Sequence, residues 1–119
     1  MIYYGYRKCS TCRKALSWLR QQGIVVEERE IRETPPSMQE LAFALKVFQG
    51  DRKRLLNVSG AEYRNMGLKD QLEDMQDDEL FRLIQSCGNL CKRPMLIDES
   101  KGLAIAGFTP ETWEQSLGV

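Results

Sequence analysis

Residues 2–22 read IYYGYRKCSTCRKALSWLRQQ, and this stretch decides the fold class. Ile2–Tyr6 is short, aromatic and β-branched, which is typical of a strand. The helical spacing of the apolar residues then predicts a helix over Cys12–Gln22, ended by Gly23. Ile24–Ile31 opens with a β-branched run and predicts a second strand near a sheet edge. A strand, a helix and a strand in this order predict a right-handed parallel βαβ unit.

The next segment, residues 35–90, predicts an all-helical insertion between strands. The pair Pro35–Pro36 ends the regular structure just after the second predicted strand. Three helix starts follow, at the capping boxes Ser37–Glu40 and Ser59–Glu62 and at the acidic run Asp77–Glu79. These helices should extend to about Phe48, Gly67 and Ser86. Because they are too short to hold a core alone, we expect the insertion to belong to the same domain as the strands.

The last third of the chain predicts a β-hairpin and a final helix. Met95–Asp98 and Leu103–Gly107 flank a short polar turn, as the two strands of a hairpin do. Thr109 followed by Pro110 predicts the N-cap and the first position of a helix. The order β-α-β, helical insertion, β-β-α indicates an α/β fold of the thioredoxin-like plan, with a mixed four-stranded sheet. We expect residues 1–119 to form one domain of this kind.

Composition and charge exclude several classes of function. Lys and Arg together number 17, as do Asp and Glu, so the net charge is zero and argues against direct binding of nucleic acid or a membrane surface. No apolar run has the length of a membrane span. The first residues, MIYYGYRKCSTC, lack the layout of a secretory signal, so a cytoplasmic location is expected. The chain has no histidine, which excludes Ser-His and Cys-His catalysis.

The strongest chemical signal is the CxxC pair of Cys9 and Cys12, at the predicted start of a helix. A thiolate there meets unpaired backbone N–H groups and the positive end of the helix dipole. Lys8 and Arg13 add positive charge nearby, so we expect Cys9 to have a lowered pKa and to be the nucleophile. Cys12, one turn further on, is placed to attack a mixed disulfide on Cys9 and resolve it.

A zinc site is the alternative for the cysteines. Cys9 and Cys12 with Cys87 and Cys91 could make a four-thiolate zinc site. Against this, the first pair lies on a predicted strand-to-helix turn and Cys87 lies at a predicted helix end. We therefore expect redox chemistry and no metal.

A second chemical signal is the run Lys92-Arg93-Pro94, directly before the third predicted strand. In a thioredoxin-like plan this loop faces the CxxC turn. Pro94 is a candidate for a cis peptide bond, which is rare and usually placed for a purpose. Arg93 would then point its guanidinium at Cys9, to hold the thiolate or to bind an oxyanion through two hydrogen bonds. Arg93, Arg13 and Pro94 are thus the substrate-binding candidates.

Five motifs, in order, resemble those of the ArsC/Spx family of arsenate-reductase-like thioredoxin-fold proteins. They are Cys9 in its CxxC turn, Asn57–Gly60, Tyr63–Arg64, Lys92–Pro94 and Gly107–Phe108. The resemblance covers nearly the whole chain. It implies that Cys9 matches the family's nucleophile and Arg93 its oxyanion-binding arginine. The family includes both arsenate reductases and redox-sensing transcription regulators, so the resemblance implies two functions.

Two departures from the reductase pattern separate these functions. The resemblance implies two further arginines in arsenate reductases, near positions where this chain has Asn57 and Gly107, and a serine where it has Cys12. It also implies glutaredoxin, thioredoxin or glutathione as the partner or reductant, with no other cofactor. The CxxC pair instead resembles that of Spx-type regulators, in which it is a disulfide switch and the partner is the carboxy-terminal domain of the α chain of RNA polymerase. A thiol redox protein, either a reductase-like oxidoreductase or a regulator, is the function that the sequence predicts.

Overall fold

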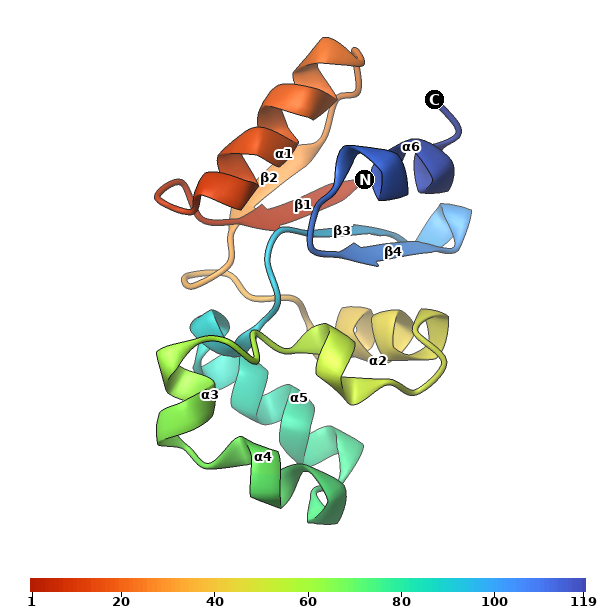
Figure 1. The fold of residues 1–119 in the computed structure, drawn as a ribbon. Coiled ribbons are helices and arrows are strands. Elements are labelled where there is room, and N and C mark those ends of the chain that lie inside the picture. Colours follow the sequence, from red (N-terminus) through yellow and green to blue (C-terminus); the bar gives the residue numbers. More distant parts are fainter.

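The computed structural model describes residues 1–119 and has a mixed four-stranded sheet with helices on both faces (Figure 1). The strands are β1 (Ile2–Gly5), β2 (Glu27–Glu30), β3 (Met95–Asp98) and β4 (Leu103–Ala106). Their order in the sheet is β2-β1-β3-β4. β1 pairs in parallel with β2 and antiparallel with β3, and β3 and β4 form the antiparallel hairpin. The predicted thioredoxin-like plan is therefore confirmed, with β2 at a sheet edge.

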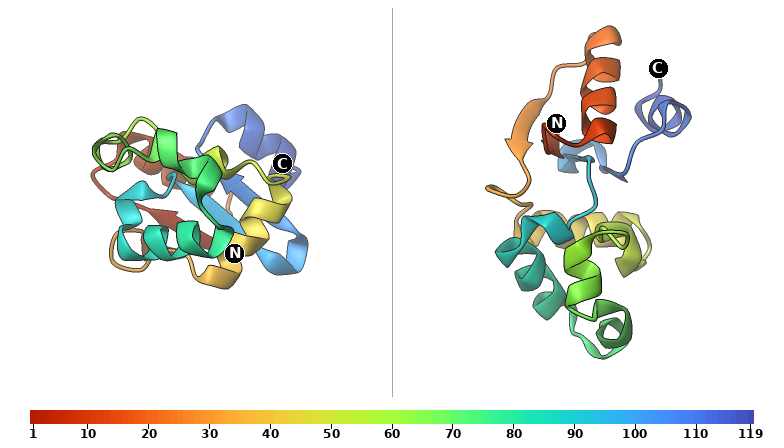
Figure 2. Two further views of the ribbon diagram at one scale, coloured as in Figure 1. Left: turned by 90° about the horizontal axis from the view of Figure 1, so that it is seen from below. Right: turned by 60° about the vertical axis from the view of Figure 1, so that its left-hand side comes forward.

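Six helices complete the fold, and the insertion extends away from the sheet (Figure 2). They are α1 (Ser10–Gln21), α2 (Met38–Val47), α3 (Ala61–Asn65), α4 (Leu68–Gln71), α5 (Asp77–Ser86) and α6 (Pro110–Leu117). Short 3-10 turns lie at Arg52–Leu55, Leu72–Asp74, Gly88–Leu90 and Glu99–Lys101. None of these helices combines the length and the apolar character that crossing a membrane would need.

The two faces of the sheet carry separate hydrophobic cores. Because side chains alternate along a strand, Tyr3 and Tyr4 of β1 enter opposite cores. Tyr3 packs with α1 and with Trp113 of α6. Tyr4 joins the larger core, which also holds the apolar side chains of α2 and α5. The insertion thus covers the second face of the sheet, and α1 and α6 cover the first.

Several element boundaries differ from the sequence predictions. The second strand is Glu27–Glu30, and the β-branched run before it is not a strand, because the four residues of β1 pair only with these four. Val25 in that run is 91% exposed. The first helix begins at Ser10, two residues earlier than predicted, with Cys9 as its N-cap. α4 was not predicted.

The predicted capping box at Ser59 is wrong. Gly60 is the N-cap of α3 and no side chain caps this helix. The Ser59 hydroxyl instead donates to Asn57 Oδ1 at 3.3 Å, and the Glu62 carboxylate accepts from Asn89 Nδ2 at 3.2 Å. The Glu62 side chain therefore bonds to Asn89, which is distant in sequence, and does not cap α3 as its spacing from Ser59 predicted. The box at Ser37 and the Thr109 cap with Pro110 are confirmed.

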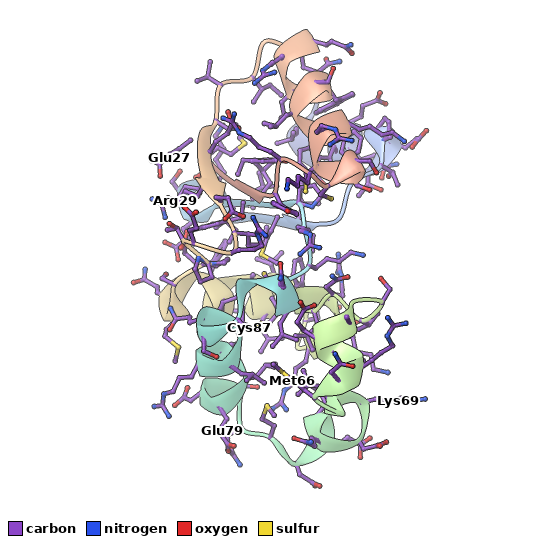
Figure 3. All side chains as sticks on the ribbon, turned by 90° about the vertical axis from the view of Figure 1, so that its left-hand side faces the viewer. Glu27, Arg29, Met66, Lys69, Glu79 and Cys87 are labelled. Atoms are coloured by element: carbon purple, nitrogen blue, oxygen red, sulfur yellow. The ribbon has the colours of Figure 1, made fainter.

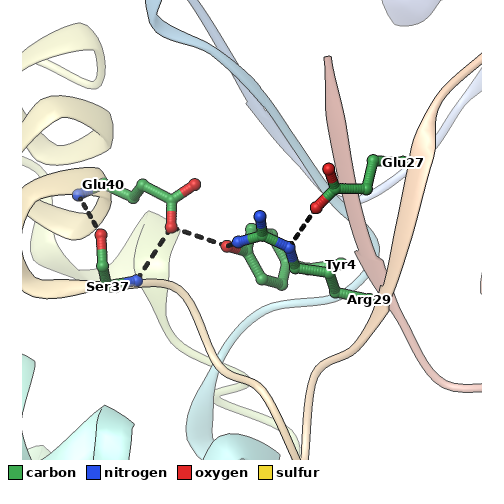
Figure 4. Close-up of polar contacts among 5 residues, drawn as sticks. All are labelled: Tyr4, Glu27, Arg29, Ser37 and Glu40. Atoms are coloured by element: carbon green, nitrogen blue, oxygen red, sulfur yellow. Dashed lines mark hydrogen bonds and ion pairs between the residues drawn. The ribbon is translucent and has the colours of Figure 1, made fainter.

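A polar network joins the sheet to the insertion through the buried carboxylate of Glu40 (Figure 4). Its Oε1 accepts the Tyr4 hydroxyl at 2.6 Å and the Ser37 backbone N–H at 3.0 Å. Arg29 of β2 donates to the same tyrosine oxygen at 2.8 Å. Hydrogen bonding to the carboxylate and burial both favour the neutral phenol, so the pKa of Tyr4 is raised, with burial the larger cause.

Replacing Glu40 with Ala should lower the free energy of unfolding by about 2 kcal/mol, since two donors lose a charged acceptor in a buried site. Glu40→Gln is the matched control, because its amide oxygen can still accept from both donors, and it should lose less. Urea unfolding of the three proteins measures the difference. Equal unfolding free energies for Glu40→Ala and the wild type would contradict this role.

Candidate active site

The CxxC turn lies between the end of β1 and the first turn of α1. Cys9 is the N-cap of α1, and its Sγ accepts the backbone N–H of Cys12 at 3.4 Å. An N-cap side chain takes one of the helix N–H groups that have no partner inside the helix. Cys9 is partly exposed, whereas Cys12 is buried. The structure thus presents one thiol to solvent and keeps the other one turn inside, as predicted.

The environment of Cys9 lowers its pKa below the ordinary value of a thiol. Partial burial is the largest single influence and acts to raise the pKa. Hydrogen bonding from Cys12, together with hydrogen bonding and Coulomb attraction from Arg93, outweighs it. The Cys9 thiolate is therefore favoured by the helix start and by one arginine.

Cys12 has the opposite environment. Burial, followed by its interaction with Cys9, raises the pKa of the Cys12 thiol to about 11. Its backbone carbonyl accepts the Tyr3 hydroxyl at 2.8 Å, which ties this turn of the helix to β1. The two thiols therefore differ in both exposure and acidity, which is the asymmetry expected of an attacking and a resolving cysteine.

Arg93 and Pro94 lie at the same end of the sheet as the CxxC turn. β1 and β3 are antiparallel, and Tyr4 pairs with Met95, so the start of β3 lies beside the end of β1. The Arg93–Pro94 peptide bond is cis, as the sequence suggested. The Arg93 guanidinium donates to Asn89 Oδ1 at 3.3 Å and lies 5.7 Å from the centre of the Tyr6 ring.

Arg13 takes a different place from the one that its sequence position suggested. Its guanidinium donates to the carbonyl of Arg7 at 3.0 Å, and it is not among the main groups that shift the Cys9 pKa. Arg13 instead lines a hollow of about 460 Å³ between α1 and β2, beside Tyr6 and Cys12. The structure thus places Arg93 at the sheet end that carries the CxxC turn and directs Arg13 to the Arg7 carbonyl.

A second hollow, of about 550 Å³, runs along α1 on the side of Thr11 and Lys14. Its apolar part is made by Trp18, Phe108 and Pro110. The rings of Trp18 and Phe108 lie 6.2 Å apart between centres and pack with Trp113 behind them. Because Thr11 lies between the two cysteines, this groove starts at the CxxC turn.

The four cysteines do not come together. Cys91 is fully buried in the core shared with the insertion, where burial raises its pKa to about 12. Cys87 lies at the end of α5, in the insertion (Figure 3). No three metal-ligating side chains of the chain converge on one point. The zinc alternative therefore has no geometrical support.

Mild oxidation should join Cys9 and Cys12 in a disulfide, because the N-cap and the third helical position bring the two Sγ atoms within bonding reach. Peptide mapping under non-reducing conditions identifies the pair. Cys12→Ser is the control and should leave Cys9 without an internal partner. A disulfide between Cys9 and either Cys87 or Cys91 would contradict this geometry.

Comparison with protein families gives a match that spans the candidate site. The model of the ArsC family matches residues 4–116. The chain belongs to the ArsC family. Since the match includes the CxxC turn, the insertion and the Arg93 loop, the family covers every part of the site described above.

Relatives of this ArsC-family chain include both unassigned and regulatory proteins. The uncharacterized protein YusI of Bacillus subtilis (strain 168) is 39% identical over 116 residues, 98% of this chain and 97% of YusI. The global transcriptional regulator Spx of the same organism is 29% identical over 98 residues, 82% of this chain and 73% of Spx. The crystal structure of a possible arsenate reductase from Streptococcus mutans UA159 has a TM-score of 0.84 and 34% identity, covering 95% of this chain and 96% of that one.

The two positions where arsenate reductases were expected to have arginine both lie close to the Arg93 loop. The Asn57 backbone N–H donates to the Leu90 carbonyl at 2.7 Å, and that of Gly107 to the Pro94 carbonyl at 2.8 Å. Gly107 has a φ of +78°, a conformation that an arginine adopts only with strain. Of the three arginines that the resemblance implies for an arsenate reductase, this chain has Arg93.

Sequence reasoning missed two residues that contact Arg93, namely Asn89 and Tyr6. Tyr6 opens the motif around Cys9 that carried the family resemblance, but its contact with Arg93 was not predicted, and Asn89 lies outside every such motif. For Asn89 the one available signal was its spacing, since it precedes Arg93 by four residues.

Proposed function

We propose that this ArsC-family protein is a thiol redox protein in which Cys9 is the nucleophile and Cys12 the resolving thiol. One observation carries the proposal: the partly exposed Cys9 is the N-cap of α1, and its Sγ accepts the Cys12 backbone N–H at 3.4 Å. A lowered pKa increases the thiolate fraction near neutral pH, and the thiolate is the species that attacks a disulfide.

The proposed cycle with a disulfide substrate has two exchange steps. The Cys9 thiolate attacks one sulfur of R–S–S–R′, forms a Cys9–S–S–R mixed disulfide and releases R′–S⁻, which takes up a proton. Cys12 then loses its proton to solvent and attacks Cys9 Sγ, releasing R–S⁻ and leaving a Cys9–Cys12 disulfide. Two electrons pass to the substrate, and two glutathione thiols or a glutaredoxin or thioredoxin dithiol return them.

Three residues are proposed to meet the substrate. Arg93 offers a planar fork of donors to an anionic group next to the reacting sulfur. Pro94 lies next to it at the start of β3, and Arg13 lines the hollow on the other side of α1. We place this chemistry in the cytoplasm, where reducing conditions keep such a pair in the thiol form between turnovers.

The direct test is turnover of a small disulfide, such as 2-hydroxyethyl disulfide, with glutathione as reductant and with or without glutaredoxin. The proposal expects turnover that depends on Cys9. Loss of Cys87, which lies in the insertion, should leave the rate unchanged. Equal rates for Cys9→Ser and the wild type would overturn the proposal.

A second candidate function is redox regulation through a protein partner. The similarity to the transcriptional regulator Spx favours it, as does the CxxC pair, which the resemblance to Spx-type regulators implies to be a disulfide switch. In that case the Cys9–Cys12 disulfide would change binding to the carboxy-terminal domain of the α chain of RNA polymerase and not drive turnover. Binding of the purified domain to the oxidised and the reduced protein tests this, and equal or absent binding in both states rejects it.

A further inference from the structure

We infer that Asn89 and Glu62 are positioning residues for Arg93, so that the helical insertion sets the reactivity of Cys9. The inference rests on the proposed role of Cys9 as nucleophile and extends it to two side chains of the insertion. Neither of them touches the sulfur. Each acts through the guanidinium.

Two hydrogen bonds connect Glu62 of the insertion to the Arg93 guanidinium. Arg93 Nη1 donates to Asn89 Oδ1 at 3.3 Å, and Asn89 Nδ2 donates to Glu62 Oε1 at 3.2 Å. A guanidinium can only donate and an ionised carboxylate can only accept. The Asn89 amide satisfies both neighbours in one orientation alone, so Glu62 determines which amide atom faces Arg93.

The backbone around Asn89 fixes these two hydrogen bonds in place. Asn89 belongs to the 3-10 turn Gly88–Leu90, and a Cβ at Gly88 would collide with the backbone of Ile31 just after β2. Two backbone hydrogen bonds flank the turn, from the Asn57 N–H to the Leu90 carbonyl at 2.7 Å and from the Lys92 N–H to the Leu55 carbonyl at 2.8 Å. The turn is therefore held against both the sheet and the insertion.

A long arginine side chain needs such support to act on one sulfur. An unsupported guanidinium would spread over many rotamers, and its mean effect on the thiolate would fall. The Tyr6 ring supplies an aromatic contact, with its centre 5.7 Å from the Arg93 Cζ, and Asn89 supplies a hydrogen-bond acceptor. Together they hold the guanidinium where it lowers the Cys9 pKa.

The sign of the Glu62 effect separates positioning from simple electrostatics. A negative charge near a thiolate raises the thiol pKa, so removing Glu62 as a mere charge would lower the pKa of Cys9. Removing it as a positioning residue would release Asn89 and Arg93 and would raise that pKa. The two roles therefore predict shifts in opposite directions.

The experiment measures the pH midpoint of Cys9 alkylation by iodoacetamide, read peptide by peptide with mass spectrometry, in proteins that keep the wild-type circular dichroism. Asn89→Ala and Glu62→Ala should each raise the midpoint by about half a pH unit, less than Arg93→Ala does. Glu62→Gln should stay near the wild type, because its amide oxygen still accepts from Asn89. Glu73→Ala removes an exposed carboxylate of the insertion and should have no effect.

The same two substitutions are then measured in a protein that also carries Arg93→Ala. In Arg93→Ala protein, Asn89→Ala should add no further rise, and Glu62→Ala should no longer raise the midpoint. If Arg93→Ala raises the midpoint and neither Asn89→Ala nor Glu62→Ala does, the positioning role is wrong and the proposed function stands. If Arg93→Ala itself changes nothing, both this inference and the proposed activation of Cys9 fail.

Discussion

Cys9→Ser protein should lose disulfide reduction by at least about a thousandfold, because removing the nucleophile of a covalent mechanism removes the reaction path itself. Cys12→Ser protein should fail differently. It keeps the partly exposed Cys9 and its Arg93 neighbour, so the first exchange still occurs. Without a resolving thiol, the mixed disulfide on Cys9 should accumulate and persist until an external thiol releases it.

Intact mass measurement after addition of a small disulfide distinguishes the two variants. Cys12→Ser should gain one substrate half, and Cys9→Ser should gain none at the CxxC turn. Cys87→Ser is the matched control, since it removes a partly exposed thiol from the insertion, and it should behave as the wild type does. A stable adduct on Cys12 in the Cys9→Ser protein would reverse the assigned roles.

The rate of arsenate reduction by this protein should be about two to four powers of ten below that of a site with three arginines. Asn57 and Gly107 stand where two charge-assisted donors were expected. Each missing bond of this kind costs about 1.5–3 kcal/mol. Each 1.4 kcal/mol lost in the transition state is about a tenfold loss of rate. Of the three arginines that the resemblance implies for arsenate reductases, only Arg93 would be left to donate to the oxyanion.

Steady-state turnover of arsenate with glutathione and glutaredoxin measures this loss. Asn57→Arg should raise the rate, whereas Gly107→Arg should be less effective, because its φ of +78° strains any side chain and its Cβ would lie 3.3 Å from Lys92 Cε. Arg64→Ala, which removes an exposed arginine of α3, is the control for overall charge. Turnover of the wild type at about one per second or faster would refute the expectation.

Local sequence patterns predicted the fold well, because they depend on short-range chemistry. The Ser37 capping box, the Thr109-Pro110 start of α6 and the hairpin of β3 and β4 follow from residues within a few positions of each other. The extent of β2 did not follow, because it is set by the four residues of its partner β1. The residues next to a strand end do not show where a partner strand distant in sequence stops pairing.

The candidate site was predicted only in part for the same reason. The Cys9–Cys12 turn was visible because one helix start holds both cysteines. Arg13 seemed close to Cys9 by sequence, yet its side chain turns to the Arg7 carbonyl. Glu62 matched a local cap and instead contacts Asn89, 27 residues away. Contacts between residues so far apart in sequence depend on how the insertion packs, and residue spacing does not predict that packing.

The activation of Cys9 by Arg93 is tested most directly by the pH dependence of Cys9 alkylation in wild-type, Arg93→Ala and Arg13→Ala proteins. The wild-type midpoint should lie below about 8.5, the value of an ordinary thiol. Arg93→Ala should raise it toward that value, since the Arg93 charge and hydrogen bonding help to lower the Cys9 pKa, and Arg13→Ala should leave it unchanged. An ordinary midpoint in the wild type, or a rise in Arg13→Ala with none in Arg93→Ala, would contradict the assignment.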